Sequence, residues 1–153
     1  MRCTPPAEGG RVSSDVRRHA MPLPEDMLQG ASLENEEGWR KGGFLGVLMT
    51  AESHNLACLG GQYQFRFDDG TCEMYWLCAD ADERREDQTW SEFVASSNDQ
   101  VRSRFIKLCE TADIDKEIED WDFVRKKKQQ GVDPMEYLWF VASFVTEEEF
   151  NEL

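Results

Sequence analysis

The clearest hydrophobic pattern in the chain is a pair of alternating segments over residues 63–76. Three aromatic residues alternate with polar ones before Asp69-Gly70, and Cys72, Met74 and Trp76 alternate with other residues after it. A period of two indicates strands with one buried face, and a two-residue Asp-Gly loop favours a type I′ hairpin turn. The sequence therefore predicts an antiparallel β-hairpin that turns at Asp69-Gly70.

The register of this hairpin follows from its apolar face. If Asp68 pairs with Thr71, six apolar residues share one face, with Phe67 opposite Cys72, Phe65 opposite Met74 and Tyr63 opposite Trp76. Arg66 and Glu73 then form a favourable pair on the other face. A slip of one residue would expose the apolar face to water, so we expect this pairing.

Hydrophobic spacing changes to the helical period in the second half of the chain. A capping box begins at Thr89, and the apolar residues that follow it predict a long amphipathic helix over about residues 90–111. A second helix is expected after Asp113 or Asp115, as far as about residue 130. Its apolar stripe consists of Ile114, Ile118, Trp121 and Val124.

Two further helices are expected near the C-terminal end. The segment Asp133-Pro134-Met135-Glu136 combines an N-cap residue, a proline for the first turn and a capping-box glutamate. It predicts a third helix over residues 137–145, which are apolar nearly all round and therefore expected to be buried. Thr146 and Glu149 form another capping box and predict a short final helix.

The first third of the chain gives less specific signals. Residues 44–51 are apolar and fit either a buried strand or a short helix. Gly60-Gly61 predicts a turn, and Trp39 is expected to anchor its segment on the body of the protein. Residues 1–20 are rich in Gly, Pro, Ser and Arg and are expected to form a flexible tail, unless the native chain starts at Met21.

Together these elements predict an α+β fold, in which an antiparallel hairpin or sheet in the first half packs against three to four C-terminal helices. The βαβ alternation typical of parallel sheets does not occur. Residues 21–153 have a suitable length for a single domain. The hydrophobic fraction of 40%, with nine Phe and five Trp, provides a core that needs neither disulfides nor a metal.

Charge narrows the choice of partners. The formal net charge is −14, and a polyanionic surface repels nucleic-acid phosphates and anionic lipids. We therefore expect no direct binding to nucleic acid or membranes, and no segment approaches the roughly 20 apolar residues that cross a bilayer. A basic protein is the favoured partner, because opposite charge speeds encounter.

The five cysteines are odd in number and form no CxxC pair, which indicates reduced thiols and a cytoplasmic protein. Cys72 and Cys78 share one face of the predicted strand, and Cys109 lies on the apolar stripe of its helix. We expect these three thiols to be buried and inert. For Cys58 the sequence leaves the exposure open.

Catalytic motifs are missing from the sequence. It contains no glycine-rich nucleotide loop, serine nucleophile elbow or zinc-ligand spacing, so no cofactor and no metal site is predicted. His54 lies beside Ser53, and a histidine near a nucleophile suits general-base catalysis. A histidine in a surface turn is the commoner case, which leaves a small enzyme using carboxylates with His54 or Cys58 as an alternative.

An acidic surface is the remaining candidate site. Residues 110–122 contain seven acidic residues and one lysine, and the acidic loop that follows residue 79 is expected to continue this surface. Ile114, Ile118 and Trp121 either anchor a partner or pack inward, and one apolar stripe per helix favours the core. The predicted partner-binding residues are Asp80, Asp82, Glu83, Glu110, Asp113, Asp115, Glu117, Glu119, Asp120 and Asp122.

Three functions fit these features. The first is a non-catalytic protein-binding module, an acidic inhibitor or immunity-type protein that neutralises a basic toxin or nuclease-like partner; small acidic bacterial immunity proteins have a similar composition. The second is the small enzyme. The third is an oligomeric adaptor whose exposed patch of Trp39, Trp121 or Phe150 drives association. The acidic charge and the missing catalytic motifs favour the first function, while the partner and the oligomeric state stay open.

Overall fold

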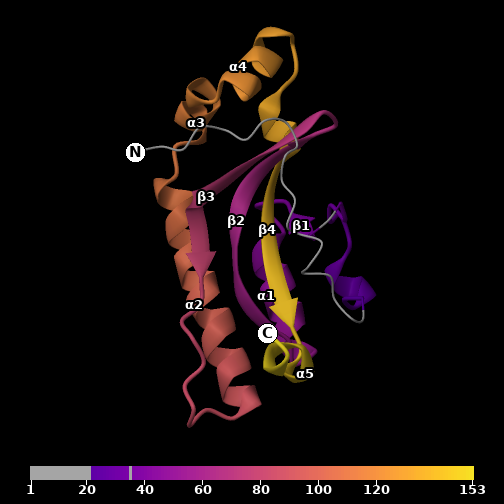
Figure 1. Cartoon of the computed structure of the whole chain (residues 1–153), viewed down its shortest axis with the longest axis vertical. Helices are drawn as coiled ribbons and strands as arrows, with labels where there is room; N and C mark the ends of the chain where they lie inside the picture. The colour runs from indigo at the N-terminus through magenta and orange to yellow at the C-terminus, as the bar shows by residue number, and fades with distance from the viewer. Residues whose placement is uncertain (1–21, 35) are drawn as a thin grey trace.

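The computed structural model of the chain describes residues 22–34 and 36–153 and confirms the α+β class (Figure 1). The predictions for residues 1–20 and for Met21 lie outside the described residues. In chain order the elements are η2 (Glu25–Met27), β1 (Gly38–Trp39), α1 (Phe44–Ser53), β2 (Ala57–Phe67), β3 (Gly70–Asp80), α2 (Trp90–Thr111), α3 (Ile114–Asp120), α4 (Asp122–Gln129), η3 (Pro134–Tyr137), β4 (Leu138–Val145) and α5 (Glu147–Asn151).

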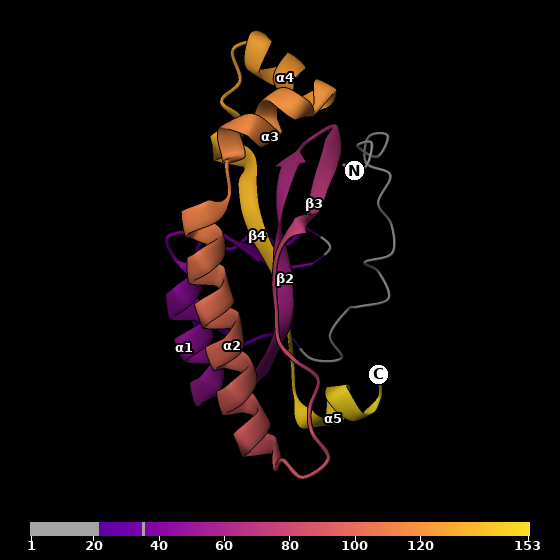
Figure 2. The ribbon, with the colours of Figure 1, turned by 90° about the vertical axis from the view of Figure 1, so that its left-hand side faces the viewer.

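The strands form one antiparallel sheet in the order β1-β4-β2-β3. Both α1 and α2 lie on the same side of this sheet (Figure 2). The short helices α3 and α4 lie beyond the C-terminal end of α2, and α5 lies at the opposite end of the molecule, near the start of α2 (Figure 1).

The centre of the core is a triangle of three phenylalanine rings from three different elements. Phe44 of α1, Phe105 of α2 and Phe140 of β4 have ring centroids 4.7–4.8 Å apart, and each side chain is at most 2% exposed. Tyr63 of β2 adds an edge-on contact with Phe140 at 5.2 Å. We call these three phenylalanines the core triangle; it joins both helices to the sheet.

The predicted third helix over residues 137–145 is wrong, because these residues form strand β4. Asp133 does cap a turn, since its side chain accepts a hydrogen bond from the Met135 amide, but the turn is the short 3₁₀ helix η3. β4 lies between β1 and β2 and is buried on both faces. A strand in that position is apolar without alternation, so its sequence pattern resembles that of a buried helix.

The hairpin has the predicted apolar face but a different turn. Phe67 pairs with Gly70 and Phe65 with Cys72, so the loop is Asp68-Asp69 and the predicted pairing is wrong by two residues. A shift of two leaves every side chain on its face. Among the described non-glycine residues only Asn55 has a positive φ, so the turn is not type I′. Instead Lys127 of α4 binds Asp69, with Nζ and Oδ2 2.7 Å apart.

The predicted core position of Cys78 is wrong, although Cys72 is buried as expected. The pairing of β2 with β3 passes from Tyr63–Met74 to Gln62–Cys78, so three residues of β3 lie opposite no residue of β2. An odd number of extra residues reverses which side chains point inward. Cys78 is therefore exposed, while Leu77 and Ala79 are buried.

Residues 44–51, for which strand and helix both remained open, belong to α1. The turn predicted at Gly60-Gly61 is wrong, because both glycines lie inside β2. Gly60 has φ of 136°, and a Cβ on Gly61 would lie 2.4 Å from the carbonyl oxygen of Val141. Glycine is needed here so that β4 can pack closely against β2.

Two capping boxes and the role of Trp39 agree with the structure, whereas Cys109, expected to be buried, is only partly buried, and the predicted second helix is broken. The capping boxes at Thr89 and Thr146 begin α2 and α5. Trp39 is 2% exposed and its Nε1 donates to the Met27 carbonyl at 2.7 Å, so it anchors its segment as expected. The predicted second helix is divided at Trp121, whose extended backbone separates α3 from α4.

We predict that Gly61→Ala lowers the free energy of unfolding by about 2 kcal/mol, because the new methyl group overlaps the backbone of β4. Gly46→Ala is the matched control, since Gly46 is exposed on α1 and a methyl group added there would meet no neighbouring atom. It should stabilise the protein by about 0.5–1 kcal/mol. Urea unfolding checks both values, and equal effects of the two changes would contradict the packing of β2 on β4.

Candidate interaction surface

Cys58 and His54, the side chains proposed for the alternative of a small enzyme, lie in different environments. Cys58 is fully buried, and its amide donates to Oδ1 of Asn98 at 2.7 Å. His54 is exposed at the end of α1, where its Nε2 lies 3.1 Å from both carboxylate oxygens of Asp26. The Ser53 hydroxyl donates to the carbonyl of Thr50. Cys58 and His54 therefore share no accessible site, and Ser53 is bonded within its own helix.

The acidic residues predicted over 110–122 lie on α3 and its borders, close to the basic residues of α4. Asp120 pairs with Lys116 at 2.8 Å, Glu119 pairs with Lys128 at 3.5 Å, and Asp122 pairs with Arg125. Glu110, Asp113 and Asp115 are exposed, Asp113 caps α3, and Glu117 is 5% exposed. Residues 110–130 carry seven acidic and five basic side chains, a net charge of only −2.

The apolar residues of this segment pack inward, as the single stripe predicted. Ile118 and Trp121 are 3% and 1% exposed, and Ile114 packs against the core. Trp121 stacks on Trp76 with ring centroids 5.9 Å apart. Trp39 is also buried and Phe150 is partly buried, so these three rings form no exposed patch of the kind that the adaptor hypothesis requires.

Asp80, Asp82 and Glu83 are exposed, as predicted. Asp82 contacts the middle of α2, where Arg104 Nη1 lies 3.1 Å from its Oδ1 and Gln100 donates to its carboxylate. Seven residues of α2, about 10 Å of helix, separate Arg104 from the end of α2 at Thr111. The continuous acidic face stays a prediction, and along this stretch of α2 Arg104, which is paired with Asp82, lies between Asp82 and α3.

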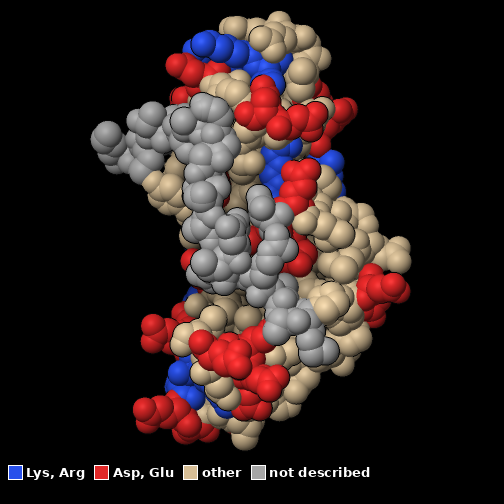
Figure 3. All heavy atoms as spheres, turned by 45° about the vertical axis from the view of Figure 1, so that its right-hand side comes forward, with Lys and Arg blue, Asp and Glu red and all other residues tan. Residues whose placement is uncertain are grey.

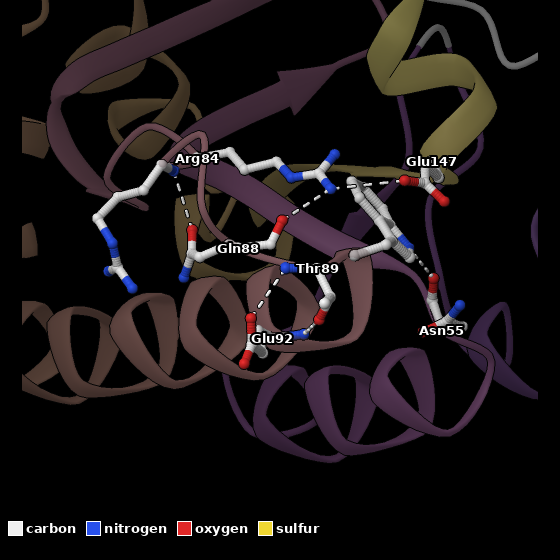
Figure 4. Close-up of polar contacts among 8 residues, drawn as sticks. Asn55, Arg84, Gln88, Thr89, Glu92 and Glu147 are labelled. Carbon is white, nitrogen blue, oxygen red and sulfur yellow. Dashed lines mark hydrogen bonds and ion pairs between the residues drawn. The ribbon is translucent and has the colours of Figure 1, made fainter.

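The acidic loop instead joins α5, and Arg84 makes the connection (Figure 4). Its Nη2 donates to the carbonyl of Gln88 at 3.1 Å and lies 3.5 Å from Oε2 of Glu147 at the start of α5. The guanidinium carbon lies 5.2 Å from the ring centre of Trp90 and 5.8 Å from that of Phe150. Arg84 thus binds the loop, α2 and α5 together.

Aromatic packing also connects α5 to the start of α2. Trp90, Phe93 and Phe150 form a second triangle, with ring centroids 5.3–5.6 Å apart. Trp90 Nε1 donates to the carbonyl of Asn55 at 2.9 Å, which ties the start of α2 to the end of α1. α5 has only five residues, so it depends on this packing and on Arg84 in addition to its cap at Thr146.

Hydrogen bonds from Gln88 fix the shape of the loop. Gln88 is 8% exposed; its Oε1 accepts from the Arg85 amide at 3.0 Å, and its Nε2 donates to the hydroxyl of Ser96 at 3.1 Å. The next residue, Thr89, forms its reciprocal cap with Glu92 (Figure 4). The acidic side chains of the loop are therefore displayed from an ordered backbone.

We call residues 80–92 and 147–152 the acidic end. Together they carry ten acidic side chains and two arginines, a net charge of −8. Figure 3 shows how the acidic end differs from residues 110–130. Acidic atoms predominate near the acidic end, whereas basic and acidic atoms are interleaved around α3 and α4. Sequence reasoning missed the contribution of α5, although the run of Glu147, Glu148 and Glu149 was visible.

In the described residues no group of three or more His, Cys, Asp or Glu is arranged to hold a metal ion. None of the helices in that part of the chain has the length and apolar character of a bilayer-spanning segment. No protein-family model, curated protein or solved structure matches the chain.

Arg84→Met should lower the free energy of unfolding by about 1–2 kcal/mol, because it removes a charged hydrogen bond to a carbonyl and two ring contacts. Arg85→Met is the control: Arg85 pairs only with exposed Asp87 through its side chain in the described structure, so its loss should change stability by less than about 0.5 kcal/mol. Urea unfolding and protease cleavage of the loop measure both, and equal effects would contradict the role of Arg84.

Thiol alkylation should separate the cysteines of the described chain. Burial raises the pKa of the Cys58 and Cys72 thiols to about 12, so almost no thiolate forms in the native state and the buried sulfurs are inaccessible. Exposed Cys78 should react first with iodoacetamide at pH 8, although its pKa is raised too, by partial burial and by Asp80. Peptide mass mapping before and after urea checks this order; modification of Cys58 before Cys78 would contradict it.

Proposed function

We propose that this chain is a non-catalytic binding protein that captures a basic protein partner through the acidic end. The observation that carries the proposal is the surplus of eight negative charges on a surface that Arg84 and the Trp90, Phe93 and Phe150 rings hold in one arrangement. A charged surface on an ordered backbone can complement a basic partner without losing much conformational entropy on binding.

An inhibitor or immunity-type protein that neutralises a basic toxin or nuclease-like partner is the specific form of this proposal. Opposite charge raises the encounter rate, and such steering weakens as salt rises. The ordered loop supports this form, since it presents Glu83, Glu86 and Asp87 as exposed carboxylates next to α5. Binding should therefore be tight at low salt and should weaken steeply as salt is added.

Charge reversal tests the location of binding. Glu83→Lys, Glu86→Lys and Asp87→Lys together should weaken capture of the basic partner at least about 10-fold, because attraction becomes repulsion. The matched control, Glu110→Lys, Asp115→Lys and Glu119→Lys, changes three exposed residues near α3 and alters the net charge by the same amount. It should retain most of the affinity.

Capture from the native lysate on immobilised protein, eluted with rising salt and identified by mass spectrometry, provides the partner for this comparison. The affinity of the purified partner is then measured for the wild-type protein and for each variant. The ratio of each variant's affinity to the wild-type affinity gives the loss that each set of substitutions causes. Loss of binding in the α3 variant with none in the loop variant would move the site to residues 110–122. Equal modest losses in both variants would show that only total charge matters.

A further inference from the structure

The outer side of α1 and α2, which faces away from the sheet, is covered by no other element of the described chain (Figure 2). Two large apolar side chains are exposed on these helices: Met49 of α1 is 71% exposed, and Ile106 of α2 is 36% exposed. The buried side chains of both helices point to the sheet instead. The outer side is therefore an unpartnered helix face that carries apolar residues.

Ile106 is flanked by two opposite charges at helical spacing. Arg102 lies four residues before it and Glu110 four residues after it, so the three side chains lie along one stripe of α2. Both charged residues are exposed. Arg102 also pairs with Asp99 on its own helix at 3.5 Å, which leaves other N–H groups of its guanidinium available.

The charge of this part of α2 differs from that of the whole chain. From Asp99 to Glu110 the helix has three basic and two acidic side chains, a net charge of +1, whereas the chain has a net charge of −14. This stretch therefore lacks the excess of negative charge that would repel a second copy of the protein.

We infer that the stripe of Arg102, Ile106 and Glu110 is the contact between two copies of the chain, which pack through α2 in antiparallel orientation about a two-fold axis at Ile106. In a two-fold contact residue i meets residue j and j meets i. Arg102 of each copy then faces Glu110 of the other, and the two Ile106 side chains meet. Rows of residues four apart are also the ridges that interdigitate in the commonest helix packing. Charge complementarity around an apolar centre thus selects a second copy as the occupant.

Such a dimer keeps both acidic ends free. Glu92, at the start of α2, lies fourteen residues from Ile106, about 21 Å along the helix. In an antiparallel pair the two helix starts point in opposite directions, which places the acidic ends roughly 40 Å apart. Their mutual repulsion is screened at physiological salt, where the Debye length is about 8 Å. The inference does not depend on the proposed function, because the dimer contact uses none of the residues of the acidic end.

Sedimentation equilibrium of the full chain at about 0.15 M salt, from about 1 µM to about 1 mM protein, tests the inference. The wild-type chain should dimerise as its concentration rises. Arg102→Glu and Glu110→Arg should each weaken the dimer at least about 10-fold, because each change places like charges opposite each other at both ends of the contact. The chain that carries both changes should dimerise like the wild type, since it only exchanges the two charges.

Mixing the two single variants gives the matched control. One variant has two carboxylates on the stripe and the other has two guanidinium groups, so an equimolar mixture should associate although each variant alone associates weakly. Circular dichroism confirms that each variant is folded. A wild-type chain that stays monomeric would overturn the inference, and so would single variants that dimerise as well as the wild type or a mixture that does not associate. Each of these results leaves the proposed function standing if the loop reversal abolishes capture of the basic partner.

Discussion

Three phenylalanine rings from α1, α2 and β4 meet at nearly equal distances, and the rest of the fold is arranged around this contact. Each buried ring contributes about 1.5–3 kcal/mol by its removal from water. Phe44 and Phe140 are 96 residues apart in the chain, so the contact forms only when the last strand inserts between β1 and β2. Folding of the N-terminal half therefore depends on the C-terminal half.

The position of β4 also determines the position of the acidic end. α5 begins two residues after β4 ends, so the position of β4 places Glu147 and Phe150 next to the start of α2. There Phe150 completes the triangle with Trp90 and Phe93, and Glu147 meets Arg84. Arg84 and three aromatic rings thus hold the loop and α5 together in a region with ten acidic side chains. The binding surface that we propose is therefore a consequence of sheet topology.

The sequence predicted best the features that depend on neighbouring residues. The caps at Thr89 and Thr146 and the buried faces of Phe65 and Cys72 follow from local hydrogen bonding and alternation. The features that failed depend on distant partners. Residues 138–145 are almost all apolar because β4 lies between β1 and β2 and most of its side chains are buried, and Gly61 is small because the Val141 carbonyl approaches it.

In the candidate site, too, local features could be predicted and features that depend on distant residues could not. Asp80, Asp82 and Glu83 were predicted as exposed acids and they are exposed, since charge in a loop is a local property. The pairing of Asp82 with Arg104 and the connection of the loop to α5 through Arg84 could not be predicted, because both depend on where α2 and β4 lie. The small net charge of residues 110–130 likewise arises because the basic residues of α4 lie next to the acidic residues of α3.

Amide hydrogen exchange of the full chain, alone and saturated with the captured basic partner, tests the central claim most directly. Binding slows exchange where the partner excludes water or suppresses local opening. We predict new protection over residues 80–92 and 147–152, with little change over residues 110–128. Protection confined to residues 110–128, with the acidic end exchanging as fast as in the free protein, would contradict the account.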